Sequence, residues 1–262
     1  MSITLIDSHC HLTSDALYEQ VDDVISRAQG AGVIEFVTIA TDLADAARAL
    51  ALSERYPSVH VAAGIHPHEA GKVSDGWSAS LKIIASRSDV FAVGEMGLDY
   101  HYDFADRATQ ERIFRQQLQI ATEVGKPVVI HCREAHADVM RILKEFPSVK
   151  GVVFHCFTGT PAEADEIWSA GHWLSLTGVV TFKKSDELRE VARRLPEERI
   201  MVETDSPYLS PEPVRSMRPN EPATVVHTAA RIAQERGMSP EALAEISTAN
   251  TRRFFGLRFS TE

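Results

Sequence analysis

The sequence of 262 residues contains only three cysteines. A small and odd number of cysteines argues against a disulfide framework and is typical of a protein from a reducing compartment. The first fifteen residues have no basic start and no long apolar core, so no signal peptide is predicted. No apolar run approaches the ~18 residues that a membrane span requires. We therefore expect a cytoplasmic protein that does not enter a membrane.

The sequence also lacks an excess of basic residues. Its 27 lysines and arginines are outnumbered by 37 aspartates and glutamates, which gives a net charge of −10. A protein that coats nucleic acid usually has a basic surface, because its affinity comes from neutralised phosphates. An enzyme that binds one or two phosphates can be acidic overall, because bound metal ions supply positive charge locally. The charge therefore disfavours a binding module more than it disfavours an enzyme.

Short apolar runs alternate with longer amphipathic stretches along the whole chain. The runs are rich in Val, Ile and Ala, as in parallel strands that are buried on both faces. The predicted strands are residues 3–6, 34–40, 59–64, 90–94, 127–131, 151–155, 173–176 and 200–202. The predicted helices are residues 16–29, 42–55, 107–123, 135–146, 162–170, 186–194, 223–236 and 241–255. This alternation, with no repeat and no linker, predicts one (β/α)8 TIM barrel domain over residues 1–262.

Acidic residues and histidines follow five of the predicted strands. In the first, His9 and His11 point the same way and Cys10 points away, because a strand alternates its faces. The C-terminal ends of the strands form the rim on which β/α barrels place their active sites. Four histidines and two carboxylates exceed the three or four protein ligands of one catalytic zinc, so we expect two ions. The predicted ligands are His9, His11, Glu95, His131, His155 and Asp205.

Glu95 is the expected bridge between the two ions, since its strand lies between those of the other ligands. The ligands of the first ion are then His9, His11, Glu95 and Asp205, and those of the second are Glu95, His131 and His155. Each cysteine is the neighbour of a predicted ligand and is turned away from it by strand alternation. A zinc site that uses Cys10, Cys132 or Cys156 is therefore disfavoured.

Further polar residues are placed on the same rim. His66 and His68 follow the third predicted strand, and Arg133 lies two residues beyond His131. A guanidinium group matches a phosphate with two parallel hydrogen bonds. We predict that His66 and Arg133 bind substrate phosphate, whereas a structural role is equally open for His68 and His101. The proline-rich residues 206–221 form a predicted loop on this rim.

Six short segments carry a further signal. They read DSHCHL at 7–12, GIHPH at 64–68, GEMGLDY at 94–100, VVIHCREA at 128–135, HCFTG at 155–159 and ETDSPYL at 203–209. Together they resemble the TatD family of metal-dependent deoxyribonucleases in the amidohydrolase superfamily, from Asp7 to about Gly256. The family's six metal-binding positions fall on the six ligands predicted above. Residues 214–222 depart from the family's pattern because Pro219 is interposed, which leaves the position of Arg218 relative to the substrate open. Met96 and Glu134 are minor departures.

The resemblance implies a hydrolase that cleaves phosphodiester bonds in DNA, as a 3′–5′ exodeoxyribonuclease or a related DNase, at short or single-stranded ends. We expect a monomer and two divalent ions, Zn, Mg or Mn, that activate a water molecule. In this scheme Asp205 accepts the proton of the water, and Arg133 offsets charge on the phosphoryl oxygens. Asp99 and Tyr100 support the metal ligands.

Two other functions compete with this interpretation. An amidohydrolase or esterase, such as a deacylase of aminoacyl-tRNA, would keep the scaffold and change the bond that is cleaved. Many barrel amidohydrolases carry a carboxylated lysine on the fourth strand, and Glu95 in its place favours the DNase-like branch. A metal-binding protein without activity requires a degraded site, and the complete ligand set disfavours it.

Overall fold

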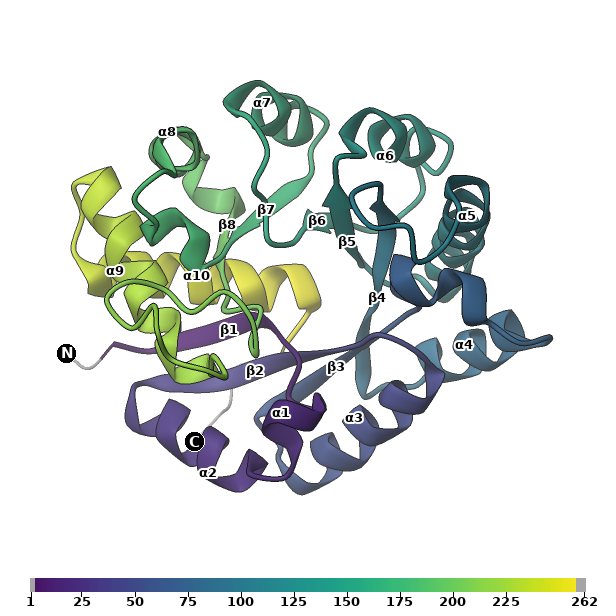
Figure 1. Ribbon diagram of the computed structural model, residues 1–262, viewed down its shortest axis with the longest axis horizontal. Coiled ribbons are helices and arrows are strands. Elements are labelled where there is room, and N and C mark those ends of the chain that lie inside the picture. Colours follow the sequence, from purple (N-terminus) through teal and green to yellow (C-terminus); the bar gives the residue numbers. More distant parts are fainter. Residues whose placement is uncertain (1–2, 258–262) are drawn as a thin grey trace. The chain divides into compact units, whose positions relative to one another are not determined.

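The structure is a computed structural model that describes residues 3–257. Its chain divides into two compact units. The first runs up to Thr38 and resumes at Cys156, and the second runs from Ile39 to His155. Strands and helices alternate along the chain in both units (Figure 1). The expectation of a single domain remains a prediction.

The strands of the described residues form one sheet in chain order, from β1 to β8. The pairs β1–β2, β3–β4, β4–β5, β5–β6 and β7–β8 are parallel. The strands are β1 (Leu5–Cys10), β2 (Val33–Ala40), β3 (Val59–Ala63), β4 (Val90–Asp99), β5 (Val128–Arg133), β6 (Val152–Phe154), β7 (Trp173–Leu176) and β8 (Ile200–Val202). Strand order and alternation with helices confirm the predicted (β/α)8 barrel class.

Helices follow the strands as the amphipathic pattern predicts. They are α1 (Asp15–Tyr18), α2 (Val21–Gly30), α3 (Leu43–Arg55), α4 (Trp77–Ala85), α5 (Arg107–Val124), α6 (His136–Leu143), α7 (Pro161–Ser169), α8 (Asp186–Arg194), α9 (Val225–Arg236) and α10 (Pro240–Phe255). Short 3-10 segments are η1 (Pro67–Lys72), η2 (Gly178–Thr181), η3 (Glu197–Arg199) and η4 (Pro222–Thr224). Between residues 3 and 257, no helix is both long and apolar enough to cross a membrane.

Two helical predictions need correction. The stretch 16–29 is two helices rather than one, because the backbone of Gln20 leaves the helical region (φ −119°, ψ 23°) between them. Helix α4 is absent from the helices predicted from the sequence, and it begins after Gly76 in the left-handed region (φ 81°). It buries Trp77, Leu81 and Ala85 at a spacing of four residues, which places them on one helix face.

Strand β4 is longer than the predicted residues 90–94, and its extension carries two acidic side chains into the sheet. It continues to Asp99, where it pairs with Arg133 of β5. Gly94 and Gly97 have φ values of 144° and 142°. A Cβ atom at Gly94 would meet the carbonyl oxygen of Val129 at 2.6 Å, and one at Gly97 would collide with the carbonyl of His131. Glycine at both positions therefore lets β4 approach β5 closely.

In the first unit, β1 also extends beyond the predicted residues 3–6 and reaches Cys10. The chain beyond β8 continues to pair with it through a parallel bridge between Cys10 and Ser206. The amide of Asp205 donates to the carbonyl of His9 (3.0 Å), and the amide of His11 donates to that of Ser206 (2.8 Å). This backbone pairing places Asp205 beside the histidines of β1.

Candidate functional site

The first unit brings His9, His11 and Asp205 together, as the sequence predicts. The Nε2 atoms of the two histidines are 3.3 Å apart. The Oδ1 atom of Asp205 lies 3.6 Å from Nε2 of His9 and 3.4 Å from Nε2 of His11. Two imidazoles and one carboxylate whose donor atoms converge in this way can hold one divalent ion. We call this set the first group.

The backbone holds Asp205 in an uncommon conformation. Its φ is 52°, in the left-handed region that few residues other than glycine adopt, although Asp tolerates it better than most. The carbonyl of Asp205 accepts a hydrogen bond from the amide of Tyr208 (3.0 Å). The Asp205 side chain is 14% exposed, against 0% for His9 and 10% for His11. The carboxylate of the first group is therefore its most accessible member.

Two buried acids, Asp7 and Glu203, lie two residues before His9 and Asp205 of the first group, and neither has a role predicted from the sequence. Asp7 accepts hydrogen bonds from the amide (2.9 Å) and hydroxyl (2.6 Å) of Thr204, directly before Asp205. Burial raises the pKa of Asp7 to about 8. Glu203 accepts from the amide of Cys156 (2.6 Å) and from the hydroxyl of Ser175. An acid in a buried strand is costly unless it is paired, and that cost is the signal that could have pointed to both.

The second unit gathers histidines around the carboxylate of Glu95, which is 2% exposed. Its Oε1 atom lies 2.7 Å from Nδ1 of His131, 2.6 Å from Nε2 of His155 and 3.5 Å from Nε2 of His66. Glu95, His131 and His155 form a second set of donor atoms that can hold an ion. The structure thus brings together the ligands predicted for the second ion. We call Glu95, His66, His131 and His155 the second group.

Asp99 contacts His131 of the second group on the side of the ring opposite Glu95. Its Oδ2 atom lies 2.9 Å from Nε2 of His131 and 2.8 Å from Nε2 of His68. The ring of His131 is therefore held between two carboxylates, Glu95 on Nδ1 and Asp99 on Nε2. This position agrees with the supporting role predicted for Asp99, because such partners fix a ligand's ring orientation. Tyr100, the other predicted support, donates to Asp138 (3.0 Å).

The ionisable side chains of the second group shift one another's pKa values. Burial alone would raise the pKa of Glu95, but His155, His66 and His131 together hold it well below its ordinary value. Burial lowers the pKa of His66 to about 4, partly against the attraction of Glu95. His66 is therefore a neutral imidazole at pH 7, able to ligate a metal or donate a hydrogen bond. It offers no positive charge to a phosphate.

The two predicted phosphate-binding residues lie in different surroundings. His66 is half-buried within the second group, where its ring centroid is 4.6 Å from that of His131. Arg133 is exposed at the end of β5, and its guanidinium group lies over the ring of Tyr102, 4.8 Å from the centroid. Only Arg133 therefore presents a charged group to solvent, as phosphate binding requires. The other uncertain histidine, His101, forms an exposed ion pair with Glu134 (2.7 Å).

The cysteines stay outside both groups. Cys10 is buried, and its thiol donates to the carbonyl of Val37 (3.5 Å). Burial raises the pKa of the Cys10 thiol well above its ordinary value. Within residues 3–257, the sets of side chains able to hold a metal include no cysteine. These positions agree with the alternation argument.

The proline-rich loop after β8 folds back on itself. Arg218 donates to the hydroxyl of Ser210 (3.0 Å) and to the carbonyl of Arg215 (2.9 Å), both within the same loop. Asn220 is fully buried and donates to the carbonyl of Tyr208 (2.6 Å). Glu221 pairs through both oxygens with Arg27 (2.8 Å each).

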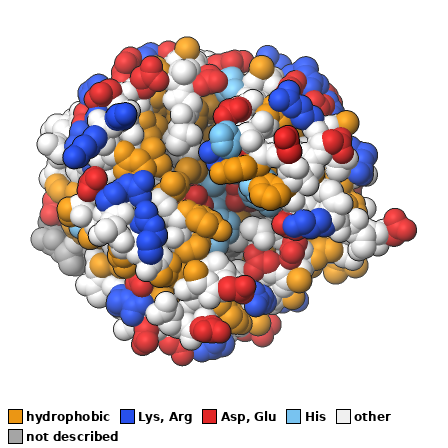
Figure 2. Space-filling model, viewed as in Figure 1, with side chains coloured by type: hydrophobic (Ala, Val, Ile, Leu, Met, Phe, Trp, Pro, Cys, Tyr) orange, Lys and Arg blue, Asp and Glu red, His pale blue; other side chains and the backbone are white. Residues whose placement is uncertain are grey.

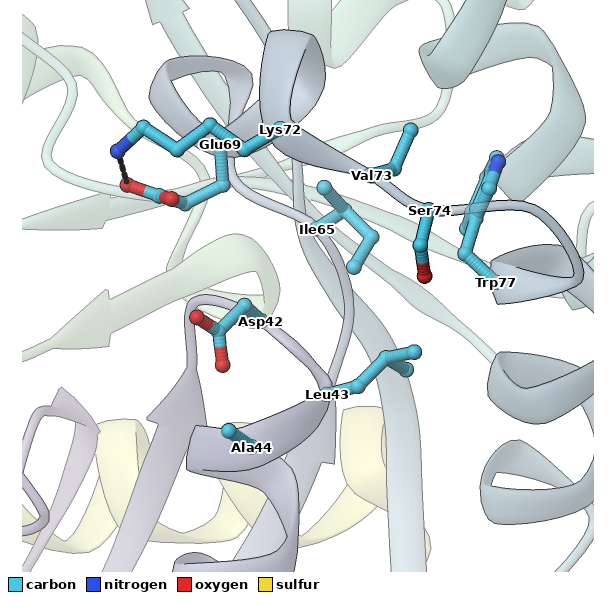
Figure 3. Close-up of a pocket in the computed structure, with 9 residues that line it drawn as sticks. All are labelled: Asp42, Leu43, Ala44, Ile65, Glu69, Lys72, Val73, Ser74 and Trp77. Carbon is cyan, nitrogen blue, oxygen red and sulfur yellow. Dashed lines mark hydrogen bonds and ion pairs between the residues drawn. The ribbon is translucent and has the colours of Figure 1, made fainter.

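A pocket of about 190 Å³ opens elsewhere in the second unit (Figure 3). The ion pair between Lys72 and Glu69 (2.9 Å) borders one side of it, and Trp77 lies on another. Its remaining lining residues are Asp42, Leu43, Ala44, Ile65, Val73 and Ser74. None of the predicted site residues lines this pocket. On the face in Figure 2, acidic and basic side chains are interspersed.

The two groups consist of side chains typical of metal-dependent hydrolases, and comparison with known proteins identifies the family. The model of the family described as TatD related DNase matches residues 6–256. The chain belongs to this family. It is therefore a hydrolytic nuclease, and the predicted resemblance is confirmed.

Relatives and solved structures match this TatD-related chain over nearly its full length. An uncharacterized metal-dependent hydrolase, YabD of Bacillus subtilis, is 38% identical over 96% of this chain and 98% of its own. The 3′–5′ ssDNA/RNA exonuclease TatD of Citrobacter koseri is 38% identical over 97% of this chain and 100% of its own. The crystal structure of YjjV, a TatD homologue of Escherichia coli, matches with a TM-score of 0.93 at 28% identity, over 98% of this chain and 100% of that chain.

Proposed function

We propose that this protein is a 3′–5′ exonuclease that removes nucleotides from single-stranded DNA ends with the help of two divalent metal ions. The observation that carries the proposal is the presence of two convergent sets of imidazole and carboxylate donors, one in each unit. Family membership supports nuclease chemistry, and the TatD relative of Citrobacter koseri carries this activity in its name.

The donor sets fit divalent ions in number and in chemistry. His9, His11 and Asp205 would hold one ion, because their three donor atoms lie within 3.6 Å of one another. Glu95, His131 and His155 would hold the other. Imidazole-rich sets suit zinc, while added carboxylates also suit manganese and magnesium in phosphodiester chemistry. When bound, such ions supply a nucleophilic hydroxide at neutral pH and offset charge on the phosphoryl oxygens.

The side chains of this chain divide the remaining work. Asp205 accepts the proton of the attacking water, because its carboxylate is the most exposed member of the first group. Asp99 keeps the ring of His131 in place from the side opposite Glu95. The exposed guanidinium group of Arg133 binds a substrate phosphate. We retain as a prediction that Glu95 serves both ions.

The test is a substrate panel assayed with metal-depleted protein and with the same protein after Zn, Mn or Mg is restored. Single-stranded oligonucleotides labelled at the 5′ end should be shortened stepwise from the 3′ end once metal is restored, and phosphorothioate linkages at that end should stop the reaction. The panel includes duplex DNA, amides and aminoacyl esters, the last two representing the amidohydrolase and deacylase alternatives. Faster turnover of an amide or an aminoacyl ester than of any oligonucleotide would replace the proposal.

A further inference from the structure

Two aromatic rings are exposed in the segment between β4 and α5 of the second unit. Tyr102 is 41% exposed and Phe104 is 60% exposed, and both are among the few large hydrophobic side chains on the surface of residues 3–257. Their ring centroids are 5.6 Å apart. Large apolar groups that gather on a surface indicate a binding site more often than chance exposure.

These rings lie next to the second group. The ring of Phe104 is 4.6 Å from that of His68, and the ring of Tyr102 is 5.5 Å from it. His68 in turn contacts Asp99 (2.8 Å), which also holds His131. The ring centroid of His68 is also 6.0 Å from that of His131, so a ligand on the two rings would be separated from this predicted metal ligand by His68.

The segment that carries the rings is fixed in place rather than loose. The Oδ1 atom of Asp99 accepts hydrogen bonds from the amides of His101 (3.0 Å) and Tyr102 (3.1 Å). Further on, the side chain of Gln110 donates to the carbonyl of Ala105 (2.9 Å). These bonds keep the rings at the surface, where the hydrophobic effect alone would favour their burial. A binding surface that is already ordered loses less entropy when its ligand arrives.

The chemistry of the surface selects a flat ring attached to a phosphate. The guanidinium group of Arg133 lies 4.8 Å from the centroid of the Tyr102 ring, so a cation and two aromatic rings are adjacent. Proteins that bind single strands combine aromatic side chains, on which bases stack, with basic groups along the backbone. In a duplex the bases are already stacked and paired, and they reach such a surface only at an unpaired end.

We propose that Tyr102 and Phe104 form a stacking platform for a nucleobase of single-stranded DNA, with Arg133 on the adjoining phosphate. This inference rests on the proposed nuclease function and adds to it the source of a preference for single strands. Tyr102 and Phe104 are positioning residues, because they place the strand beside the second group and take no part in bond cleavage.

The first experiment compares Phe104→Ala with Ile83→Ala, a matched control at another exposed apolar side chain (72% exposed) of the same unit. Phe104→Ala should raise KM for single-stranded DNA by about 5-fold to 100-fold, the range that stacking of one base covers, with kcat nearly unchanged. Phe104→Trp should keep KM near the wild-type value. Phe104→Leu should raise KM as Phe104→Ala does, because stacking needs an aromatic face. Equal KM for wild type, Phe104→Ala and Ile83→Ala would overturn the platform.

The second experiment removes the base instead of the ring. Oligonucleotides with one abasic position near the 3′ end should bind wild type more weakly, and at the stacked position Phe104→Ala should show no further loss. The fluorescence of 2-aminopurine at that position should be quenched by metal-depleted wild type and not by Phe104→Ala, which reports stacking without catalysis. An equal abasic penalty in wild type and Phe104→Ala, or equal quenching, would refute the proposal.

Two outcomes separate this inference from its premises. If wild type cleaves no oligonucleotide with any metal and does not quench the fluorescence of 2-aminopurine in any of them, the nuclease proposal fails and the platform fails with it. If wild type cleaves single strands but Phe104→Ala changes only the sedimentation behaviour of the protein, the rings serve contact between two copies of the chain, and the platform alone is wrong.

Discussion

The candidate metal groups of the two units are built differently. In the first group, two histidines from one strand face a single carboxylate, and their donor atoms are 3.3 to 3.6 Å apart. In the second group, the ligands come from different strands and converge on the oxygen of Glu95, at 2.6 and 2.7 Å from His155 and His131. A second carboxylate, Asp99, holds the outer nitrogen of His131.

This difference indicates a division of labour. The second group is held together by hydrogen bonds among its own side chains. The donor atoms of the first group lie 3.3 to 3.6 Å apart, beyond ordinary hydrogen-bond length, and its carboxylate meets solvent. We expect the second group to anchor the site and the first group to carry the proton transfer.

The largest expected effect comes from Glu95→Ala. Glu95 contacts three histidines, so its loss should remove the second ion and reduce kcat by orders of magnitude. If Glu95 also serves the first ion, elemental analysis should show a fall from about two ions per chain to nearly none. The exposed Glu123→Ala, at a surface pair with Lys82, is the control in the same unit. A variant that keeps one ion would show that Glu95 serves the second group alone.

Asp205→Asn tests the proton transfer assigned to the first group. The amide keeps an oxygen that can approach a metal but no longer accepts a proton. We expect kcat to fall by about 10²- to 10⁴-fold, the usual contribution of a general base, while metal content stays near that of wild type. Single-turnover kinetics and elemental analysis on the same preparation measure both quantities. Near-normal kcat with full metal content would take the proton transfer away from Asp205.

A smaller effect is expected from Asp99→Asn, which weakens the support of His131 without removing a ligand. Loss of such a partner typically lowers metal affinity by about 10- to 100-fold. Competition with a chelator should show this loss for one ion only, because Asp99 belongs to the second unit and the first group lacks it. Weaker binding of both ions, to a similar degree, would mean that the two groups are not separately held.

Local sequence predicts the paired histidines of the first group more directly than the strand extension that carries Glu95 and Asp99 of the second. Alternation along β1 places His9 and His11 on one side from local sequence alone. The extension of β4 to Asp99 depends on the approach of β5 at Gly94 and Gly97, a contact between separate strands that no local pattern displays. For the same reason Asp7 and Glu203 received no role, because their partners lie far away in the chain. Local patterns predict which residues are ligands better than what supports them.

The second unit also contains an exposed cluster of paired charges, which contrasts with the buried charges of the second group. Arg115 of α5 donates to Glu111 (2.8 Å) and, through two nitrogens, to Glu145 (2.9 and 3.0 Å). These hydrogen bonds hold the pKa of Glu111 and that of Glu145 below the ordinary value of 4.5. Pairs of this kind contribute little to stability, because water screens the charges and long side chains must be ordered.

Arg115→Ala should therefore have the smallest effect, and its dependence on pH identifies its cause. A carboxylate whose pKa is lowered by folding stabilises the native state above its unfolded pKa, and this contribution is lost as pH falls through the folded value. At pH 7 we expect Tm to fall by roughly 1–2 °C in Arg115→Ala. The difference from wild type should shrink below about pH 4.5, where the glutamates become protonated, and added salt should reduce it at pH 7. A difference that stays constant from pH 7 to pH 3 would mean that Arg115 acts through the packing of its aliphatic stem and not through charge.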